Sequence, residues 1–254
     1  MRIFALTALA LALAAPAAAR PTAAPADIDA AVADPARPEA AVKLDAGRKP
    51  AAVLKFAGLK RGDHALDLFG GSGYFTEIMA RAVGPDGRVV AWLPLSELDD
   101  KGRAAWAELK GRVSNASFFV TPNDALALPE GAFDFAMINL DYHDVYWESA
   151  KFGFRRMDPE GFLKTVYAAL KPGATIAVID HVGEPGSDPR MLADKLHRID
   201  PAVIKADFQR AGFVLEGESD LLRNPADDHS KLVFDKAIRG NTDRVFYRFR
   251  KPAK

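Results

Sequence analysis

Asp67-Leu68-Phe69-Gly70-Gly71-Ser72-Gly73 is the stretch that decides the fold of this 254-residue chain. A short apolar strand is predicted over residues 64–69, directly before the glycines, and a helix over residues 74–83, directly after them. Glycines at such a turn let a ligand approach the backbone and aim N–H groups at its polar atoms. In open α/β sheets this turn lies at the carboxyl ends of the strands, where ligands bind. The turn is therefore the first candidate ligand-binding element.

The turn does not match the two common phosphate-binding fingerprints. The dinucleotide pattern G-x-G-x-x-G fails because Thr76 stands where a third glycine would follow Gly71 and Gly73. No G-K-[ST] follows either, which excludes a P-loop. A tight structural turn without a ligand stays open as an alternative at this point.

Strands and helices alternate along most of the chain with short linkers between them. This alternation predicts a parallel sheet covered by helices on both faces. The last two strands have no helix between them, so the final one should run antiparallel. The expected strands are residues 64–69, 88–93, 116–120, 133–140, 174–180, 213–220 and 244–250, and the expected helices are residues 40–56, 74–83, 96–110, 159–170 and 201–211. Within residues 40–56, Pro50 is able to start a second helix at its first turn.

The first 19 residues have the pattern of a secretory signal peptide. Arg2 is basic, residues 3–15 are apolar, and residues 17–19 have the small-x-small form of a cleavage site. The apolar run is shorter than the roughly 20 residues that span a bilayer. We expect cleavage after Ala19, a flexible segment over residues 20–38 with one helical turn around residues 27–32, and one domain over residues 39–254. The product would be periplasmic or secreted, without a stable membrane anchor; an uncleaved anchor is the alternative.

Composition limits the classes of partner and chemistry. The chain has 34 Lys and Arg residues against 34 Asp and Glu residues, so its formal net charge is zero. A neutral chain gives no electrostatic reason to expect a nucleic-acid partner. The chain has no cysteine, which excludes disulfides, thiolate zinc sites and a cysteine nucleophile.

Several motifs resemble those of the class I S-adenosylmethionine-dependent methyltransferases. Asp67-x-x-x-Gly71-x-Gly73 resembles motif I of these enzymes. Residues 123–129 look like the segment that contacts adenine, residues 133–140 like the fourth strand, and residues 170–174 like the L-K-P-G-G turn. The resemblance implies a Rossmann-like, doubly wound α/β sheet of seven strands in the order 3-2-1-4-5-7-6, with strand 7 antiparallel.

A narrower resemblance rests on three further motifs. Gly47-Arg48-Lys49-Pro50, Asp141-Tyr142-His143-Asp144 and residues 239–244 are similar to a poorly characterised bacterial group of exported predicted methyltransferases. The resemblance implies S-adenosylmethionine as cofactor and an unidentified small molecule as methyl acceptor. The cofactor-binding residues that it implies are Asp67, Phe69, Gly70, Gly71, Gly73, Asp124, Ala125, Asn139 and Asp141.

The chain departs from the family pattern in two places. Phe69 replaces the first glycine of motif I, and we expect its side chain near the methionine part of the cofactor. The second strand ends in Val90-Ala91-Trp92-Leu93-Pro94, without the usual acid that binds the ribose hydroxyls. The nearest carboxylates are those of Asp86 and Glu97. Losing a charge-assisted acceptor costs about 1.5–3 kcal/mol, so the second departure predicts weak cofactor binding.

Candidate catalytic residues follow the predicted fourth strand. His143 has a suitable pKa for a general base, Asp144 or Asp141 would orient it, and Tyr142 is a second candidate. A cap or a loop hydrogen bond is the structural alternative for His143. The neighbouring strand ends at Asp180-His181, so a metal set of His143, His181 and Asp180 is conceivable. Because no H-x-H or H-E-x-x-H spacing supports it, we expect no metal site.

Three peripheral features complete the candidate site. Arg48 and Lys49 could meet a carboxylate of cofactor or substrate, or form a solvated helix end. His197 and Asp200 read as a solvated surface pair. Residues 222–243 have no regular pattern and should lie over the ligand face as a lid or wall.

Three functions remain open at this stage. The favoured one is methyl transfer from S-adenosylmethionine to a small molecule. The first rival is an exported ligand-binding protein on the same fold without transferase activity, because a fold does not fix a function. The second rival is a hydrolase or isomerase that uses His143 and the neighbouring carboxylates.

Overall fold

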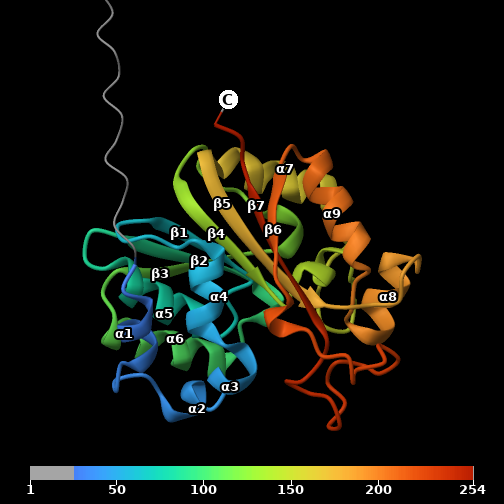
Figure 1. Cartoon of the computed structure of the whole chain (residues 1–254), viewed down its shortest axis with the longest axis horizontal. Helices are drawn as coiled ribbons and strands as arrows, with labels where there is room; N and C mark the ends of the chain where they lie inside the picture. The colour runs from blue at the N-terminus through green and yellow to red at the C-terminus, as the bar shows by residue number, and fades with distance from the viewer. Residues whose placement is uncertain (1–25, 254) are drawn as a thin grey trace, which may run out of the picture.

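The computed structural model describes residues 26–253, which form a sheet of seven strands with helices on both sides (Figure 1). The strands are β1 His64–Leu68, β2 Arg88–Pro94, β3 Ala116–Thr121, β4 Phe133–Asn139, β5 Leu170–His181, β6 Val214–Glu218 and β7 Arg244–Arg250. Their order is β3-β2-β1-β4-β5-β7-β6, and β7 runs antiparallel to β5 and β6. The predicted topology is confirmed. The expected signal peptide lies outside the described residues.

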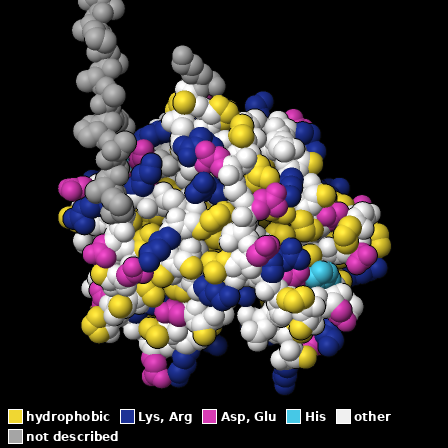
Figure 2. Space-filling view, viewed as in Figure 1, with side chains coloured by type: hydrophobic (Ala, Val, Ile, Leu, Met, Phe, Trp, Pro, Cys, Tyr) yellow, Lys and Arg dark blue, Asp and Glu magenta, His cyan; other side chains and the backbone are white. Residues whose placement is uncertain are grey.

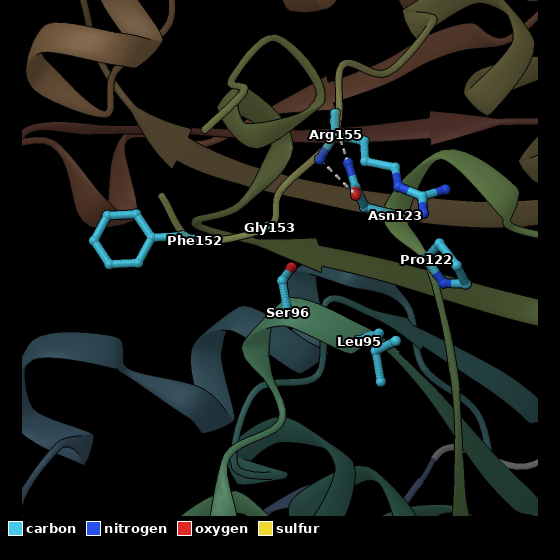
Figure 3. Close-up of a pocket in the computed structure, with 7 residues that line it drawn as sticks. All are labelled: Leu95, Ser96, Pro122, Asn123, Phe152, Gly153 and Arg155. Atoms are coloured by element: carbon cyan, nitrogen blue, oxygen red, sulfur yellow. Dashed lines mark hydrogen bonds between the residues drawn. The ribbon is translucent and has the colours of Figure 1, made fainter. Parts of the chain in front are cut away.

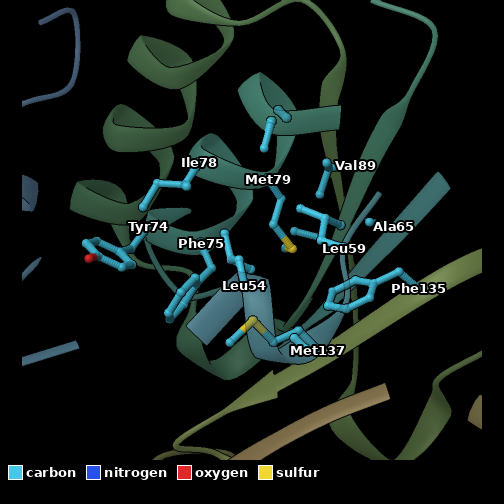
Figure 4. Close-up of a cluster of buried hydrophobic side chains, with 14 of the residues drawn as sticks. Leu54, Leu59, Ala65, Tyr74, Phe75, Ile78, Met79, Val89, Phe135 and Met137 are labelled. Atoms are coloured by element: carbon cyan, nitrogen blue, oxygen red, sulfur yellow. The ribbon is translucent and has the colours of Figure 1, made fainter. Parts of the chain in front are cut away.

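Helices cover both faces of the sheet, as the sequence predicts. The α-helices are α1 Ile28–Ala33, α2 Glu39–Val42, α3 Asp45–Arg48, α4 Pro50–Ala57, α5 Tyr74–Val83, α6 Asp100–Arg112, α7 Pro159–Ala169, α8 Pro189–Leu196 and α9 Pro201–Arg210. One apolar cluster joins α1, α4, α5 and α6 to the sheet, with Leu54, Met79 and Phe135 among its buried members (Figure 4). A second cluster joins α7 and α9 to the sheet through Phe162 and Phe208. Burial on both faces explains why the central strands are almost wholly apolar.

The N-terminal region agrees with the prediction in part. The residues expected to be helical, 40–56, form three short helices, α2, α3 and α4, and α4 begins at Pro50, where the sequence predicts that a second helix can start. Lys49 has a left-handed φ of 48° and separates α3 from α4. The helical turn predicted around residues 27–32 is observed as α1, but its Ile28 and Ala31 are buried, so this part of the segment is not a flexible tail.

The connection after β2 differs as well. The helix expected from Ser96 begins instead at Asp100, because the side chain of Asp99 caps it by accepting a hydrogen bond from Gly102 N at 2.8 Å. Residues Leu95–Glu97 form a separate 3-10 turn, η1. This turn leaves Glu97 at the carboxyl end of β2 rather than inside α6.

The surface carries charges of both signs. Figure 2 shows Lys and Arg side chains interspersed with Asp and Glu on the face displayed, which agrees with a formal net charge of zero. Among residues 26–253, no helix is both long enough and apolar enough to cross a bilayer.

Candidate functional site

The turn after β1 begins with a left-handed phenylalanine. Phe69 has a φ of 57°, a conformation that costs an L-residue about 1–2 kcal/mol. Its ring is buried and packs against Trp92 and Phe162, with ring centroids 4.7 Å and 6.0 Å away. The Phe69 side chain, expected near the methionine part of the cofactor, is instead turned by its backbone into the core beneath α7.

The three glycines of the turn have different surroundings. Gly70 donates its N–H to Trp92 O at 3.1 Å, and a Cβ there would lie 2.9 Å from the Ala91 Cβ. Gly73 has a φ of 84°, and a Cβ there would collide with Leu109 of α6. Gly71 is exposed, and nothing lies within 4 Å of the position of its missing Cβ. Gly71 is therefore open to solvent, whereas Gly70 and Gly73 allow close packing.

Asp67 anchors the turn from within the protein. Its Oδ2 accepts a hydrogen bond from Thr76 Oγ1 at 2.5 Å, which ties the end of β1 to the first turn of α5. Burial raises the pKa of Asp67 to about 6, against the opposing effect of the hydrogen bonds from Thr76. This carboxylate is held within the protein and stabilises the turn.

Arg48 and Lys49 point to different places. The Arg48 guanidinium lies over the ring of Tyr74, 4.4 Å from its centroid, at the start of α5. Burial lowers the pKa of Arg48, while the carboxylates of Asp141 and Asp67 act in the opposite direction. Lys49 Nζ instead donates to Leu221 O at 2.7 Å on the surface. Only Arg48 of this pair faces the glycine turn and the end of β4.

A pocket of about 250 Å³ lies at the carboxyl ends of β2 and β3 (Figure 3). It is lined by Leu95, Ser96, Pro122, Asn123, Phe152, Gly153 and Arg155. Asn123 is buried and holds the far wall: its Oδ1 accepts from Arg155 N at 2.9 Å, and its Nδ2 donates to Arg155 O. The next two residues, Asp124 and Ala125, are exposed beside the pocket. The segment that resembles the adenine-contacting one thus borders a cavity.

Of the two carboxylates nearest the missing ribose acid, only Glu97 lies at the carboxyl end of β2. Asp86 lies in the turn before β2, at the opposite end of the sheet, and Leu93 is buried in the core. The side chain of Glu97 is accessible to solvent, yet desolvation by the surrounding protein raises its pKa to about 8, and the nearby carboxylate of Asp144 raises it further.

The end of β4 brings further acids to the same edge. Asn139 ends the strand, Leu140 follows with a left-handed φ of 69°, and Asp141 is half-buried. Burial raises the pKa of Asp141 well above its ordinary value, and the neighbouring carboxylates, Glu97 first among them, raise it further. Two adjacent strands therefore each end in a strained residue, which is typical of functional sites.

His143 is oriented by Asp180, not by Asp144 or Asp141 as predicted. His143 Nδ1 lies 2.8 Å from Asp180 Oδ1, and the His143 backbone N–H donates to Asp180 Oδ2 at 2.7 Å. The other ring nitrogen, Nε2, lies 3.4 Å from Asp144 Oδ1. Burial lowers the pKa of His143, but Asp180 and Asp144 outweigh burial and raise it to about 9.

Tyr142 is not available for catalysis. Its side chain is fully buried, its ring centroid lies 5.3 Å from that of Phe208, and its hydroxyl donates to Asp207 Oδ2 at 2.8 Å. Burial and the Asp207 carboxylate raise its pKa well above the ordinary value. Its prediction as a catalytic residue is wrong, because the 3-10 turn over Tyr142–Val145 sends adjacent side chains in different directions.

The structure brings His197 into the site, which the sequence analysis missed. Asp200 caps α9 by accepting from Ala202 N at 2.8 Å, so it is not the partner of His197. His197 ends α8 with a φ of 50°, and its Nδ1 lies 3.3 Å from His143 Nε2. His181 lies apart from that contact, with Nδ1 2.6 Å from Thr242 Oγ1, and burial lowers its pKa well below the ordinary value.

Residues 223–243 form an irregular wall beside His197. The buried ion pair of Arg198 with Asp227, at 2.9 Å, and the pair of Arg223 with Asp243, at 2.8 Å, hold this segment in place. The ring centroid of Phe234 lies 5.0 Å from that of His197. The irregular course predicted from the sequence is observed.

Comparison with known sequences points to methyltransferases. The family model of protein-L-isoaspartate(D-aspartate) O-methyltransferase matches residues 36–115. The ubiquinone/menaquinone biosynthesis C-methyltransferase UbiE of Pasteurella multocida (strain Pm70) is 31% identical over 133 residues, which cover 50% of this chain and 43% of the relative. UbiE of Enterobacter sp. (strain 638) is 33% identical over 133 residues, covering 50% and 46%. The chain thus matches less than half the length of these curated relatives.

Solved structures extend the likeness over most of the chain. A SAM-dependent methyltransferase from Aquifex aeolicus has a TM-score of 0.57 at 18% identity, covering 84% of this chain and 94% of that one. A didemethyltoxoflavin N1-methyltransferase from Burkholderia thailandensis, with S-adenosylhomocysteine bound, has a TM-score of 0.51 at 16% identity, covering 88% and 81%. The [4+2]-cyclase SpnF also matches, with a TM-score of 0.57 at 17% identity and 82% of each chain covered. The protein has the class I methyltransferase fold.

Proposed function

We propose that this protein binds S-adenosylmethionine across the glycine turn and transfers its methyl group to a small-molecule acceptor. One observation carries the proposal. A cation at Arg48, the exposed backbone of Gly71, the carboxylate of Glu97 and the pocket beside Asn123 lie along one edge of the sheet, over β4, β1, β2 and β3. This order matches the chemical order of the ligand: carboxylate, sulfonium, ribose and adenine.

Each part of the ligand has a partner along this edge. Arg48 pairs with the carboxylate, and Asp141 and Asn139 at the end of β4 face the ammonium group. Glu97 accepts hydrogen bonds from the ribose hydroxyls in place of the missing acid. The base enters the pocket, where Asp124 and Ala125 contact its edge. Asp67, Gly70 and Gly73 act indirectly, because they fix the turn that presents Gly71.

The acceptor binds on the side of the turn nearest the ends of β4 and β5. Methyl transfer requires in-line placement near the sulfonium, and a base only where the acceptor carries a proton. His143 remains our predicted base, but a histidine with a pKa of about 9 is protonated at neutral pH. That role would therefore favour alkaline conditions.

Calorimetric titration with S-adenosylhomocysteine tests cofactor binding, and transfer of a labelled methyl group to a panel of acceptors tests activity. Binding without transfer would favour the ligand-binding rival. The structural likeness to a [4+2]-cyclase shows that this fold is not confined to proteins named as methyltransferases.

We further propose that the chain is exported and belongs to the bacterial group that its three narrower motifs resemble. The three motifs meet in space: Arg244 Nη2 donates to Gly47 O at 2.8 Å, and Arg48 lies within electrostatic range of Asp141. N-terminal sequencing of protein from the periplasm or medium should begin at Arg20. An intact N-terminus on cell-associated protein would contradict cleavage.

A further inference from the structure

Three of the chain's five histidines gather near the ends of β4 and β5. The ring centroid of His143 lies 5.3 Å from that of His197 and 5.9 Å from that of His181. His181 is occupied by Thr242. The remaining two share their neighbourhood with Asp144, and one ligand atom from each of these three residues lies within 4.8 Å of the others.

The three atoms form a nearly equilateral triangle. His143 Nε2 lies 3.3 Å from His197 Nδ1, and Asp144 Oδ1 lies 3.4 Å from each of these nitrogens. Two ligands of a tetrahedral zinc ion, each about 2.0–2.1 Å from the metal, are roughly 3.3–3.4 Å apart. The same separations are long for hydrogen bonds, which cluster near 2.9 Å. The triangle therefore has the dimensions of one face of a tetrahedral site.

Asp144 provides a second, independent observation. The residue is only 8% exposed, and its Oδ1 is a buried atom without a hydrogen-bond donor among the described residues. A buried carboxylate oxygen without a partner is costly, so such an atom calls for an explanation. The oxygen points at the two histidine nitrogens, where a cation would satisfy it.

The surroundings prepare the histidines as ligands. Asp180 Oδ1 accepts a hydrogen bond from His143 Nδ1–H, which turns Nε2 toward the metal position, where a metal ion would displace the Nε2 proton; this carboxylate–histidine arrangement is typical of metal sites. His197 is held by its left-handed backbone at the end of α8 and by the rings of Trp147 and Phe234, whose centroids lie 5.1 Å and 5.0 Å away. Both imidazoles are thus fixed before any metal binds.

We propose that His143, Asp144 and His197 bind a divalent transition-metal ion, with zinc as the best fit to the triangle. Three protein ligands leave a fourth position open for water or for an oxygen, nitrogen or sulfur atom of a small molecule. The set differs from the one that the sequence suggested, because Asp180 orients His143 and His181 is turned to Thr242. The expectation of no metal site is replaced by this proposal, which does not depend on cofactor binding.

The test measures zinc binding to the full-length purified protein after chelator treatment and dialysis. The key variant is His197→Asn, because asparagine tolerates the left-handed backbone of this residue while removing the imidazole. His64→Gln is the control, since His64 is exposed at the start of β1, at the far end of the sheet. Titration calorimetry gives stoichiometry and affinity, and a cobalt(II) absorption spectrum reports tetrahedral geometry.

We expect one zinc ion per chain in the wild type and in His64→Gln, and at least a hundredfold weaker binding in His197→Asn. Saturating zinc should raise the melting temperature of the first two proteins but not of the third. Asp144→Asn, which replaces a carboxylate by a poor zinc ligand of the same shape, should weaken binding similarly. The proposal is overturned if the folded wild type binds no zinc, or if His197→Asn and Asp144→Asn both bind it as tightly as the wild type.

Discussion

The ring of Phe69 packs edge-on against the indole of Trp92, with 4.7 Å between the ring centroids. A residue at this position can reach the core only because its backbone is left-handed, with a φ of 57°. The phenylalanine therefore fills the interior and leaves the space above Gly71 open. A bulky residue in the glycine turn is thus compatible with a ligand at the turn.

The left-handed backbone of Phe69 predicts that glycine is a better replacement than alanine at this position, the reverse of the usual order of stability. Phe69→Ala should lower the free energy of unfolding by about 3–5 kcal/mol through the lost ring. Phe69→Gly should be about 1 kcal/mol more stable than Phe69→Ala, because glycine relieves the left-handed strain. Urea unfolding measures both. At Phe135, buried in β4, the ordinary order should hold and glycine should be the worse replacement. If the alanine variant were more stable than the glycine variant at both positions, the strain at Phe69 would be disproved.

Substitutions at Gly71 and Gly73 should have different effects: the change at Gly71 should mainly weaken ligand binding, and the change at Gly73 should mainly lower the stability of the fold. Gly73→Ala should destabilise the protein by about 2 kcal/mol or more, because its Cβ meets Leu109 as well as a left-handed backbone. Gly71→Ala should cost only about 1 kcal/mol, since its Cβ enters open space, but should weaken S-adenosylhomocysteine binding. Thermal melts and calorimetry on both variants check this division. A Gly71→Ala protein with unchanged affinity would show that the ligand does not approach Gly71.

Arg48 and Lys49 form a matched pair for testing the carboxylate site. Arg48→Gln should weaken S-adenosylhomocysteine binding about 10- to 100-fold, the value of a charge-assisted hydrogen bond. Lys49→Gln should leave the affinity unchanged, because Lys49 donates to Leu221 O on the surface. A second ligand sharpens the test: methylthioadenosine has no amino acid group and should bind Arg48→Gln as well as the wild type. Equal losses for both ligands would place Arg48 in a structural role.

The buried carboxylate of Asp67 should make stability depend on pH. Its pKa rises from 3.8 to about 6 on folding, so the folded state holds its proton more tightly than the unfolded state. Its ionisation therefore costs nothing below about pH 4, and the cost grows as pH rises to about 6. At pH 4, Asp67→Asn and the wild type should have the same free energy of unfolding. At pH 7, the free energy of unfolding of Asp67→Asn should be higher by about 1–3 kcal/mol. Urea unfolding at both pH values measures this, and a constant difference would contradict the shift.

Much of the fold could be predicted because its signals are local. Apolar runs such as residues 133–139 mark strands that are buried on both faces, and the glycines after Asp67 mark the turn between the first strand and its helix. The missing helix before β7 predicted the antiparallel strand for a simple reason: a chain that reverses without a crossover must pair in the opposite direction.

Much of the site could not be predicted because its contacts are remote in sequence. His197 approaches His143 across 54 positions, through the course of β5 and the end of α8, and no spacing in the chain encodes this approach. Tyr142 and His143 are neighbours, yet one bonds to Asp207 and the other to Asp180. Which partner each side chain meets depends on the backbone path of one 3-10 turn, and the residue types alone do not predict that path.

The central claim is that the edge formed by Arg48, Gly71, Glu97 and the pocket beside Asn123 binds S-adenosylmethionine. Calorimetric titration of the purified wild-type protein with S-adenosylhomocysteine, which lacks the reactive methyl group, is the decisive measurement. We expect saturable binding at one site per chain, with a Kd below about 1 mM, which corresponds to at least about 4 kcal/mol of binding free energy. No binding to the folded protein at millimolar ligand would contradict it.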